Sequence, residues 1–229
     1  MRIYKDFPEA LNEVRRDLAE MGILVHPQTY QDKNVEGDSR FDARELTNYI
    51  FTVTSPNPHH LNPTQPWADH EFDERISGRQ LNPGKAYLDR REVWEQFLEK
   101  DDRFSYSYPA RLTLSRGDRQ VDYIIDRIKM DPSSRQLFMA VWDRWDIGYI
   151  GGVHRVPCSI GYLVHVRRGQ VNLTYLQRSA DFATHFVNDV YLAHRMQRYI
   201  AEQTGYQVGH YIHWIGSLHV FQKDVEGVF

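Results

Sequence analysis

The chain contains a single cysteine, Cys158, which follows a proline and is the strongest candidate for a nucleophile. The polar sequence Gln177-Arg178-Ser179-Ala180-Asp181 lies downstream of it. The thiolate is the nucleophilic form of cysteine, and a nearby arginine both favours that form and binds anionic oxygens. One cysteine cannot form an internal disulfide, so the thiol is either reactive or inert and buried. The pattern indicates a nucleophile beside an anion-binding site.

Composition limits the kinds of protein that this chain can be. With 229 residues, of which 41% are hydrophobic, it can bury a substantial core, and we expect one domain over 1–229. The formal net charge of −3 leaves no basic surface for nucleic acid. No apolar run approaches the roughly 18 residues of a membrane span, and the first residues lack the apolar stretch of a signal peptide. We therefore expect a cytoplasmic protein without a nucleic-acid or membrane partner.

Histidine pairs raise the question of a metal site. His59-His60 and the pair His210 and His213 lack a matching set of cysteines or carboxylates, so we expect no metal. A zinc deaminase has a second cysteine three positions after its Pro-Cys, where this chain has Gly161. That reading is therefore rejected.

The elements that must position these residues follow from apolar spacing and from proline and glycine boundaries. The patterns predict helices at 8–21, 87–98, about 121–128 and about 189–203, strands at 46–54, 135–142 and 211–221, and a hairpin of 158–166 with 171–177 that turns at Arg168-Gly169. The polar, proline-broken stretch 56–83 is expected to be a long surface excursion. Strands and helices alternate without a regular βαβ period, which favours an α+β layered sheet.

Several motifs follow one another in the second half of the chain. They are the segment 127–142, the Pro-Cys corner at 157–158, the Gln-Arg-Ser-x-Asp sequence at 177–181, a helix ending in Gln-Thr-Gly at 203–205, and the segment 213–221. In this order and at these separations they resemble the thymidylate synthase and pyrimidine nucleotide hydroxymethylase superfamily. The segment 127–142 resembles the one whose paired arginines reach the neighbouring subunit's phosphate site. Arg135 matches the first arginine, and Gln136 replaces the second.

The resemblance implies a single thymidylate-synthase-like domain, an α+β layered sheet with packed helices, and a homodimer formed through the sheet with composite active sites. It implies a pyrimidine nucleoside monophosphate as substrate and 5,10-methylenetetrahydrofolate as co-substrate. The roles that it implies are Cys158 as nucleophile, Gln177, Arg178, Ser179, His219 and the partner subunit's Arg135 as substrate-binding residues, and Asp181 as a pterin contact. The tyrosine that accompanies the sugar-binding histidine in the family is Phe221 here, which leaves the choice between ribose and deoxyribose open.

The prediction of which pyrimidine base is bound depends on Asp189. Counting without gaps, it takes the place of the family asparagine that contacts O4 and N3 of uracil. A carboxylate accepts a hydrogen bond from the cytosine amino group but repels the O4 acceptor of uracil. A proton shared between Asp189 and cytosine N3 also draws electrons from C6. Asp189 is therefore expected to bind cytosine and to assist catalysis, although an aspartate at this position could instead cap the long helix.

The chemistry follows from these residue types. Cys158 adds to C6 and makes C5 a nucleophile toward the one-carbon unit, with Arg178 binding the phosphate and lowering the thiol pKa. Proton transfers at the polar edge of the base need a positioned acid or base. The resemblance implies a catalytic glutamate near a tryptophan-containing early helix, where Glu92, two residues before Trp94, is the choice and Glu95 the rival. Water at the resulting methylene yields a hydroxymethyl nucleotide, whereas hydride yields a methyl nucleotide.

Three functions therefore remain. The leading prediction is folate-dependent 5-hydroxymethylation of a cytosine nucleotide, dCMP or CMP, because of Asp189. The first alternative is thymidylate synthesis by methylation of dUMP. The second is an inactive nucleotide-binding homologue, which Gln136, Phe221 and a short stretch after the last strand would suit.

Overall fold

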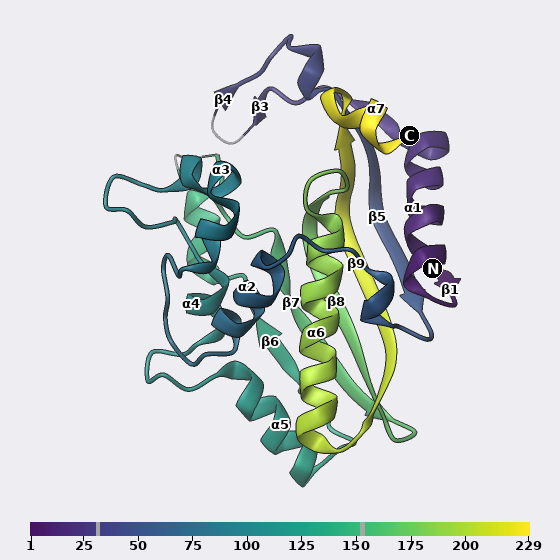
Figure 1. Ribbon diagram of the computed structural model, residues 1–229, viewed down its shortest axis with the longest axis vertical. Helices are drawn as coiled ribbons and strands as arrows, with labels where there is room; N and C mark the ends of the chain where they lie inside the picture. Colours follow the sequence, from purple (N-terminus) through teal and green to yellow (C-terminus); the bar gives the residue numbers. More distant parts are fainter. Residues whose placement is uncertain (31–32, 152–153) are drawn as a thin grey trace.

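The computed structural model describes residues 1–30, 33–151 and 154–229 and is built around a mixed β-sheet (Figure 1). In the described residues the sheet has seven strands in the order β1-β5-β9-β8-β7-β6, and β2 also pairs with β5. The strands are β1 (Arg2–Tyr4), β2 (Ile23–Val25), β5 (Ala43–Val53), β6 (Phe138–Ala140), β7 (Ser159–Arg167), β8 (Gln170–Asp181) and β9 (Gln207–Phe221). β1 is parallel to β5 and β8 is parallel to β9, whereas the other neighbours are antiparallel.

The β7–β8 hairpin has the form that the sequence predicts. It turns at Arg168 and Gly169, whose φ angles of 54° and 73° give the left-handed pair that suits a tight two-residue hairpin. Residues at every second position of β8 are buried, from Val171 to Gln177. This alternation places Gln177 on the same face of the sheet as the apolar core.

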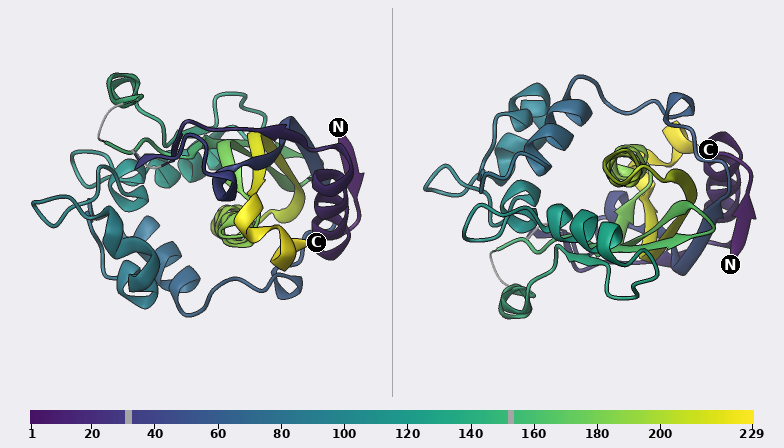
Figure 2. Two further views of the ribbon diagram at one scale, coloured as in Figure 1. Left: turned by 90° about the horizontal axis from the view of Figure 1, so that it is seen from above. Right: turned by 90° about the horizontal axis from the view of Figure 1, so that it is seen from below.

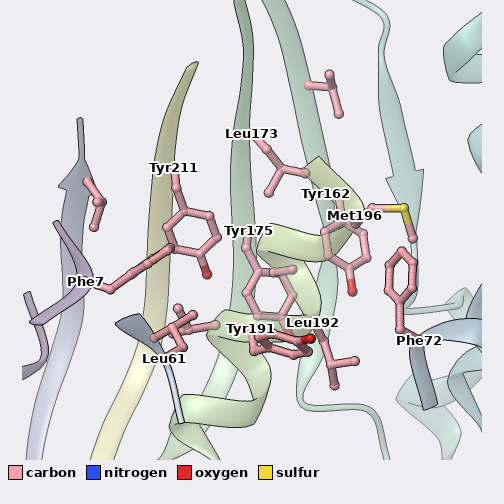
Figure 3. Packing of buried hydrophobic residues seen from close by; sticks show 14 of the residues in the cluster. Phe7, Leu61, Phe72, Tyr162, Leu173, Tyr175, Tyr191, Leu192, Met196 and Tyr211 are labelled. Carbon is pink, nitrogen blue, oxygen red and sulfur yellow. The ribbon is translucent and has the colours of Figure 1, made fainter. Parts of the chain in front are cut away.

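Helices cover that face of the sheet. The long helix α6 (Phe186–Thr204) packs on β8 and β9, and α1 (Phe7–Met21) packs on β5. Tyr162, Tyr175 and Tyr211, from three neighbouring strands, point toward α6 in Figure 3 and are almost completely buried. The rings of Tyr162 and Tyr175 are stacked with centroids 5.1 Å apart. The expected helix at 189–203 is therefore present, but it begins three residues earlier.

The expectation for 56–83 is wrong in part. This stretch contains the turn η2 (Pro58–His60) and the helix α2 (Trp67–Arg75), which contributes Trp67, Ala68 and Phe72 to the core. Its polar side chains concealed the helix from apolar periodicity, since Arg75 is buried by pairing with Glu71. The segment is part of the packed structure and lies beside α6 in Figure 1.

Two further expectations need correction. The helix predicted at 87–98 is a series of short turns, η3 (Ala86–Arg90), α3 (Arg91–Trp94) and η4 (Glu95–Phe97). The strand predicted at 135–142 is only the edge strand β6, preceded by α5 (Gln120–Met130). The remaining elements are β3 (Thr29–Tyr30), β4 (Lys33–Asn34), η1 (Ser39–Phe41), α4 (Tyr108–Leu112), η5 (Arg144–Tyr149), η6 (Gln222–Asp224) and α7 (Val225–Val228).

The other face of the sheet carries partly exposed apolar side chains. Ile50, Trp214 and Leu176 form one cross-strand row, because β9 pairs Trp214 with both of the others. The turn η5 projects on this side, opposite α6, in both views of Figure 2. Its Trp145 and Ile147 are 67% and 65% exposed. No helix in the described ranges combines the length and the apolar character that a membrane crossing requires.

Candidate active site

Cys158 lies immediately before β7, next to the end of β8. The backbone N–H of Arg178 donates to the carbonyl of Cys158 at 2.6 Å, and Nε of Arg178 donates to the carbonyl of Pro157 at 3.4 Å. Pairing of β7 with β8 aligns Ser159 with Gln177 and so holds these motifs together. The structure thus brings Arg178 to the candidate nucleophile.

The electrostatics of the thiol differ from the expectation. Burial raises the pKa of Cys158, and the positive charges of Arg178 and Arg155 lower it by a smaller amount. The nearby carboxylates of Asp189 and Asp181 raise the pKa further. Arg178 lowers the thiol pKa as expected, but burial raises it by more. The free-energy cost of removing a thiolate from water exceeds the stabilisation that a partly exposed cation provides.

Asp189 lies in the first turn of α6, and its side chain is buried. The N-cap position of that helix is occupied by His185, so the alternative interpretation of Asp189 as the helix cap is wrong. Oδ2 of Asp189 accepts a hydrogen bond from Nε2 of Gln177 at 2.7 Å. Burial raises the pKa of Asp189 to about 7, although this hydrogen bond and the charge of Arg75 act in the opposite direction. Both protonation states are therefore accessible near neutral pH.

A buried chain of hydrogen bonds orients the Gln177 amide. Nε2 of His213 lies 2.9 Å from Oε1 of Gln177, and the hydroxyl of Tyr211 lies 3.3 Å from Nδ1 of His213. Burial lowers the pKa of His213 to about 3, so the ring is neutral and has one N–H. Because the Gln177 amide nitrogen donates to Asp189, its oxygen must accept, and the network assigns the proton of His213 to Nε2. His213 thereby helps to position a donor against Asp189.

His185 and Arg90 lie on the other side of Asp189, and the sequence-based selection of site residues missed both. Nη1 of Arg90 lies 3.3 Å from Nδ1 of His185, and Nε2 of His185 lies 3.9 Å from Oδ1 of Asp189. Burial lowers the pKa of His185 to about 3, so this ring also is neutral. The detectable signal was the spacing of four residues between His185 and Asp189, which places both side chains on one face of a helix.

A cavity adjoins this network. The side chains that line it include those of Glu71, Arg75, Trp94, Tyr106, Tyr108 and His185. His185 connects the cavity with Asp189, and the hydroxyl of Tyr108 connects it with the segment after Cys158, since Oγ of Ser159 donates to it at 3.2 Å. The cavity therefore lies next to both the candidate nucleophile and the candidate base-binding carboxyl group.

The structure places a different glutamate at this cavity from the one chosen from the sequence. Glu92 and its rival Glu95 are both exposed, neither lines the cavity, and Glu95 pairs with Arg91. Glu71 lines the cavity, and burial raises its pKa. The polar pattern of 56–83 hid α2, and Glu71 was overlooked with it.

Strand pairing places the remaining predicted residues near the ends of β8 and β9. Ser179 pairs with Ser217, and Asp181 pairs with His219. Oδ1 of Asp181 accepts from the backbone N–H groups of Ala183 and Thr184 at 3.1 and 3.2 Å, so this carboxylate also shapes the turn into α6. Burial lowers the pKa of His219.

Phe221 occupies a position that suits an apolar ring. It is buried and packs edge-on against Tyr30 and His219, with ring centroids 5.1 and 5.0 Å away. The side chain therefore contributes to packing at the end of β9 and offers no hydroxyl to a sugar.

Arg135 is not at the cavity of its own chain. It is exposed and lines a separate surface hollow with Arg127, Gln136 and Arg167. Among the described residues, histidine, cysteine, aspartate and glutamate side chains form no cluster of three or more that could hold a metal ion.

Comparison with known proteins identifies the family. The family model described as thymidylate synthase matches residues 79–229, about two thirds of the chain, including Cys158, Arg178, Asp189 and His219. The chain belongs to the thymidylate synthase family. The resemblance inferred from the motifs is thus confirmed.

Individual relatives agree with this assignment. The chain is 29% identical over 142 residues to the thymidylate synthases of Bacillus phage phi3T and Bacillus subtilis subsp. natto, covering 59% of this chain and 50% of each relative. It therefore spans about half the length of these curated relatives. The structure is similar to a thermostable thymidylate synthase A from Bacillus subtilis, with a TM-score of 0.74, 21% identity and coverage of 98% of this chain and 83% of the other. This likeness confirms the expected α+β thymidylate synthase fold.

Proposed function

We propose that this member of the thymidylate synthase family transfers a one-carbon unit from 5,10-methylenetetrahydrofolate to C5 of a cytosine nucleoside monophosphate and releases the 5-hydroxymethyl nucleotide. The choice of cytosine rests on Asp189, which takes the place of the family asparagine. Its side chain is buried and accepts a hydrogen bond from Gln177. Gln177 already occupies Oδ2, and Oδ1 accepts no hydrogen bond from any described residue. Oδ1 is therefore available to the base, and Oδ2 can accept a second hydrogen bond through its other lone pair.

The hydrogen-bonding edge of cytosine suits this group. A carboxyl group that carries one proton donates to N3 and accepts from the N4 amino group. The Gln177 donor at Oδ2 favours the proton at Oδ1, because a protonated hydroxyl is a poorer acceptor. The shared proton also withdraws electrons from the ring and prepares C6 for attack by a nucleophile.

Each remaining residue has a defined task in this proposal. Cys158 loses its proton and adds to C6, and Arg178 stabilises both the thiolate and the nucleotide phosphate. Ser179 and the partner subunit's Arg135 complete the phosphate site. His219 contacts the sugar, and Asp181 contacts the pterin.

Glu71 is the better-placed candidate for proton transfer. It lines the cavity and its side chain is only 13% exposed, whereas Glu92 faces solvent. Burial raises the pKa of Glu71, which makes it a stronger base than an exposed glutamate and brings its protonated and ionised forms closer in free energy.

The cavity also suits the folate. Nε1 of Trp94 is buried and has no hydrogen-bond partner among the described residues, and the Trp94 and Trp67 rings are stacked with centroids 6.0 Å apart. An unpaired indole N–H beside a flat aromatic surface fits a heteroaromatic ring with acceptor atoms. The folate supplies the one-carbon unit that is transferred to C5.

A second candidate is methylation of dUMP, as in the relatives named thymidylate synthase. Besides those names, the raised pKa of Asp189 supports it, because a protonated carboxyl group can donate to O4 of uracil and accept from N3–H. Reduction of the one-carbon unit would then oxidise the folate to dihydrofolate.

One assay separates the two candidates. Purified protein is incubated with methylenetetrahydrofolate and dCMP, CMP or dUMP, and the products are identified by mass spectrometry while dihydrofolate absorbance is followed. We expect hydroxymethyl cytidylate without an absorbance rise, and the Cys158→Ser variant serves as the blank. Thymidylate with stoichiometric dihydrofolate would instead establish the second candidate, and no product with any nucleotide would point to a binding protein.

A further inference from the structure

Helix α2 carries a buried ion pair that faces the cavity. Nε of Arg75 donates to Oε1 of Glu71 at 2.8 Å, one helical turn away, and both residues line the cavity. Arg75 is only 3% exposed. An arginine is rarely buried to this extent, because removing its charge from water is costly unless the geometry compensates. Its presence on the core face of α2 therefore indicates a role in the cavity as well as in packing.

Three elements hold the guanidinium in place. It lies over the ring of Tyr108 at 4.0 Å from the centroid, and its Nη1 lies 3.4 Å from the hydroxyl of Tyr162 on β7. The hydroxyl of Tyr108 in turn accepts from Ser159, the residue after Cys158. Arg75 thus has little freedom to leave Glu71, and its position is fixed relative to the segment that carries the nucleophile.

The pair opposes the effect of burial on the pKa of Glu71. Burial raises the pKa of Glu71, and the charge and hydrogen bond of Arg75 are the influences that lower it, while Glu74 raises it further. The other titratable groups around the cavity do little to lower the pKa of Glu71. His185 is neutral, burial raises the pKa of both Tyr106 and Tyr108 so that they are neutral phenols, and Arg155 lies over the ring of Phe97 at 3.8 Å.

We propose that Arg75 is a positioning residue that holds Glu71 at the cavity and favours its ionised form, so that Glu71 can accept a proton from the water that attacks the one-carbon unit. This inference rests on the proposed hydroxymethylation. Without the arginine, burial would act on Glu71 without this opposing charge, and less of the carboxyl group would be in the ionised form that acts as a base.

The step balances as follows. At this stage the nucleotide is bonded to Cys158 at C6 and carries an exocyclic methylene at C5. Water oxygen bonds to the methylene carbon as its proton passes to Glu71, and the electron pair of the exocyclic double bond moves onto the ring. That pair then forms the C5–C6 double bond and expels the Cys158 thiolate. No oxidant or reductant takes part.

The pH dependence of turnover tests the role of Arg75. For wild type, kcat with the cytosine nucleotide should rise with pH as Glu71 ionises. In Arg75→Gln and Arg75→Met, this rise should move to higher pH by about one unit or more, because the opposing positive charge is gone. At neutral pH kcat should fall by about tenfold to about a hundredfold, with KM for the nucleotide within about threefold of wild type. Arg75→Lys, which keeps the charge, should lie closer to wild type.

The matched control is Arg195→Gln. Arg195 on α6 also stacks on α2, with its guanidinium 4.4 Å from the centroid of Phe72, but it does not line the cavity. Its removal should leave the pH at which kcat rises unchanged. Glu71→Gln, which is nearly isosteric, should remove the rise itself and nearly all hydroxymethyl product, and it provides a second test if the Arg75 variants do not fold.

The outcomes distinguish this inference from the proposed function. If wild type yields no hydroxymethyl product with any nucleotide, the proposed function fails and the role of Arg75 fails with it. If wild type yields the product but folded Arg75→Gln has the wild-type pH profile, or Glu71→Gln retains the rise, only the inference about Arg75 is overturned.

Discussion

At the scale of single residues, Asp189 shows how burial changes the chemistry that a residue type suggests. From the sequence, Asp189 was expected to accept from cytosine and to repel uracil, either as an ionised carboxylate or while sharing a proton with N3. In the folded protein its pKa is about 7, so a proton is available to be shared with the base. Recognition then depends on the donors that surround the carboxyl group, namely Gln177 held by His213 and His185 held by Arg90.

Binding of a cytosine nucleotide should therefore depend on pH. The pKa of Asp189 in the folded protein lies above its ordinary value of 3.8, so the group is protonated below about pH 7 and ionised above it. If the complex holds a proton between Asp189 and N3, the affinity for dCMP should fall as pH rises above 7, by at most about tenfold per unit. Isothermal titration calorimetry between about pH 7 and about pH 9, where the phosphate is already fully ionised, measures this directly. Asp189→Asn has no group that titrates here and should lack the effect. A wild-type affinity that does not vary over this range would contradict the shared proton.

Cys158→Ser should abolish turnover while leaving nucleotide binding within about tenfold. A hydroxyl is far less ionised than a thiol near neutral pH, so the substitution prevents attack at C6. The contacts with the phosphate, which determine binding, are retained. Product formation and equilibrium binding of dCMP check the two parts separately. Substantial turnover by the folded serine variant would remove the nucleophile assignment.

At the scale of elements, α2 connects the cavity with the core. Phe72 is 3% exposed and packs edge-on against Tyr199 of α6, and Tyr191 of α6 donates to Asp69 of α2 at 2.6 Å. The face of α2 that carries Glu71 and Arg75 is thus held by contacts with the longest helix. The geometry of the site depends on this packing.

Truncation of Phe72 should weaken the packing of α2 against α6. Phe72→Ala should lower the free energy of unfolding by about 3–5 kcal/mol, because it removes a buried aromatic ring and leaves a cavity. Phe72→Leu should cost less, since it keeps most of the apolar contact. Chemical denaturation of both variants measures the two changes. Equal stabilities of the alanine variant and wild type would show that α2 is not packed as described.

At the scale of the whole molecule, we propose the open face of the sheet as the interface of the predicted homodimer. The row formed by Ile50, Trp214 and Leu176 is partly exposed, and the apolar residues of η5 project on the same side. Apolar surface of this kind is typical of protein–protein contacts. Arg135, which is remote from the cavity of its own chain, could reach the site of a second copy across such an interface.

Subunit mixing tests this arrangement. Cys158→Ser and Arg135→Ala are each expected to be inactive, but hybrid dimers contain one site with both residues intact. Activity should therefore reappear on mixing, up to about half of the wild-type value per hybrid dimer. Sedimentation at assay concentration establishes the oligomeric state, and labelled subunits establish that exchange occurs. A monomer, or proven exchange without recovery, would contradict a composite site.

Local patterns were sufficient to predict part of this protein. Alternating burial along β8, the glycine turn of the hairpin, and the periodic apolar residues of α6 depend on neighbours in the chain, and all three elements form as expected. The order of the Pro-Cys, Gln-Arg-Ser-x-Asp and Gln-Thr-Gly motifs was likewise sufficient to indicate the family. The periodicity missed α2 because Arg75 lies on its buried face, paired with Glu71, and no apolar pattern records a buried ion pair.

The composition of the site was decided by tertiary structure. His213 reaches Gln177 across two paired strands, 36 positions apart in the chain, and Arg90 reaches His185 across 95 positions. Whether Glu71 or Glu92 faces the cavity depends on how α2 and the turns at 86–97 pack, and the identity of either residue does not reveal it. Burial then sets the protonation of Asp189, Glu71 and Cys158, because the free energy of a charge depends on the surroundings that the fold places around it.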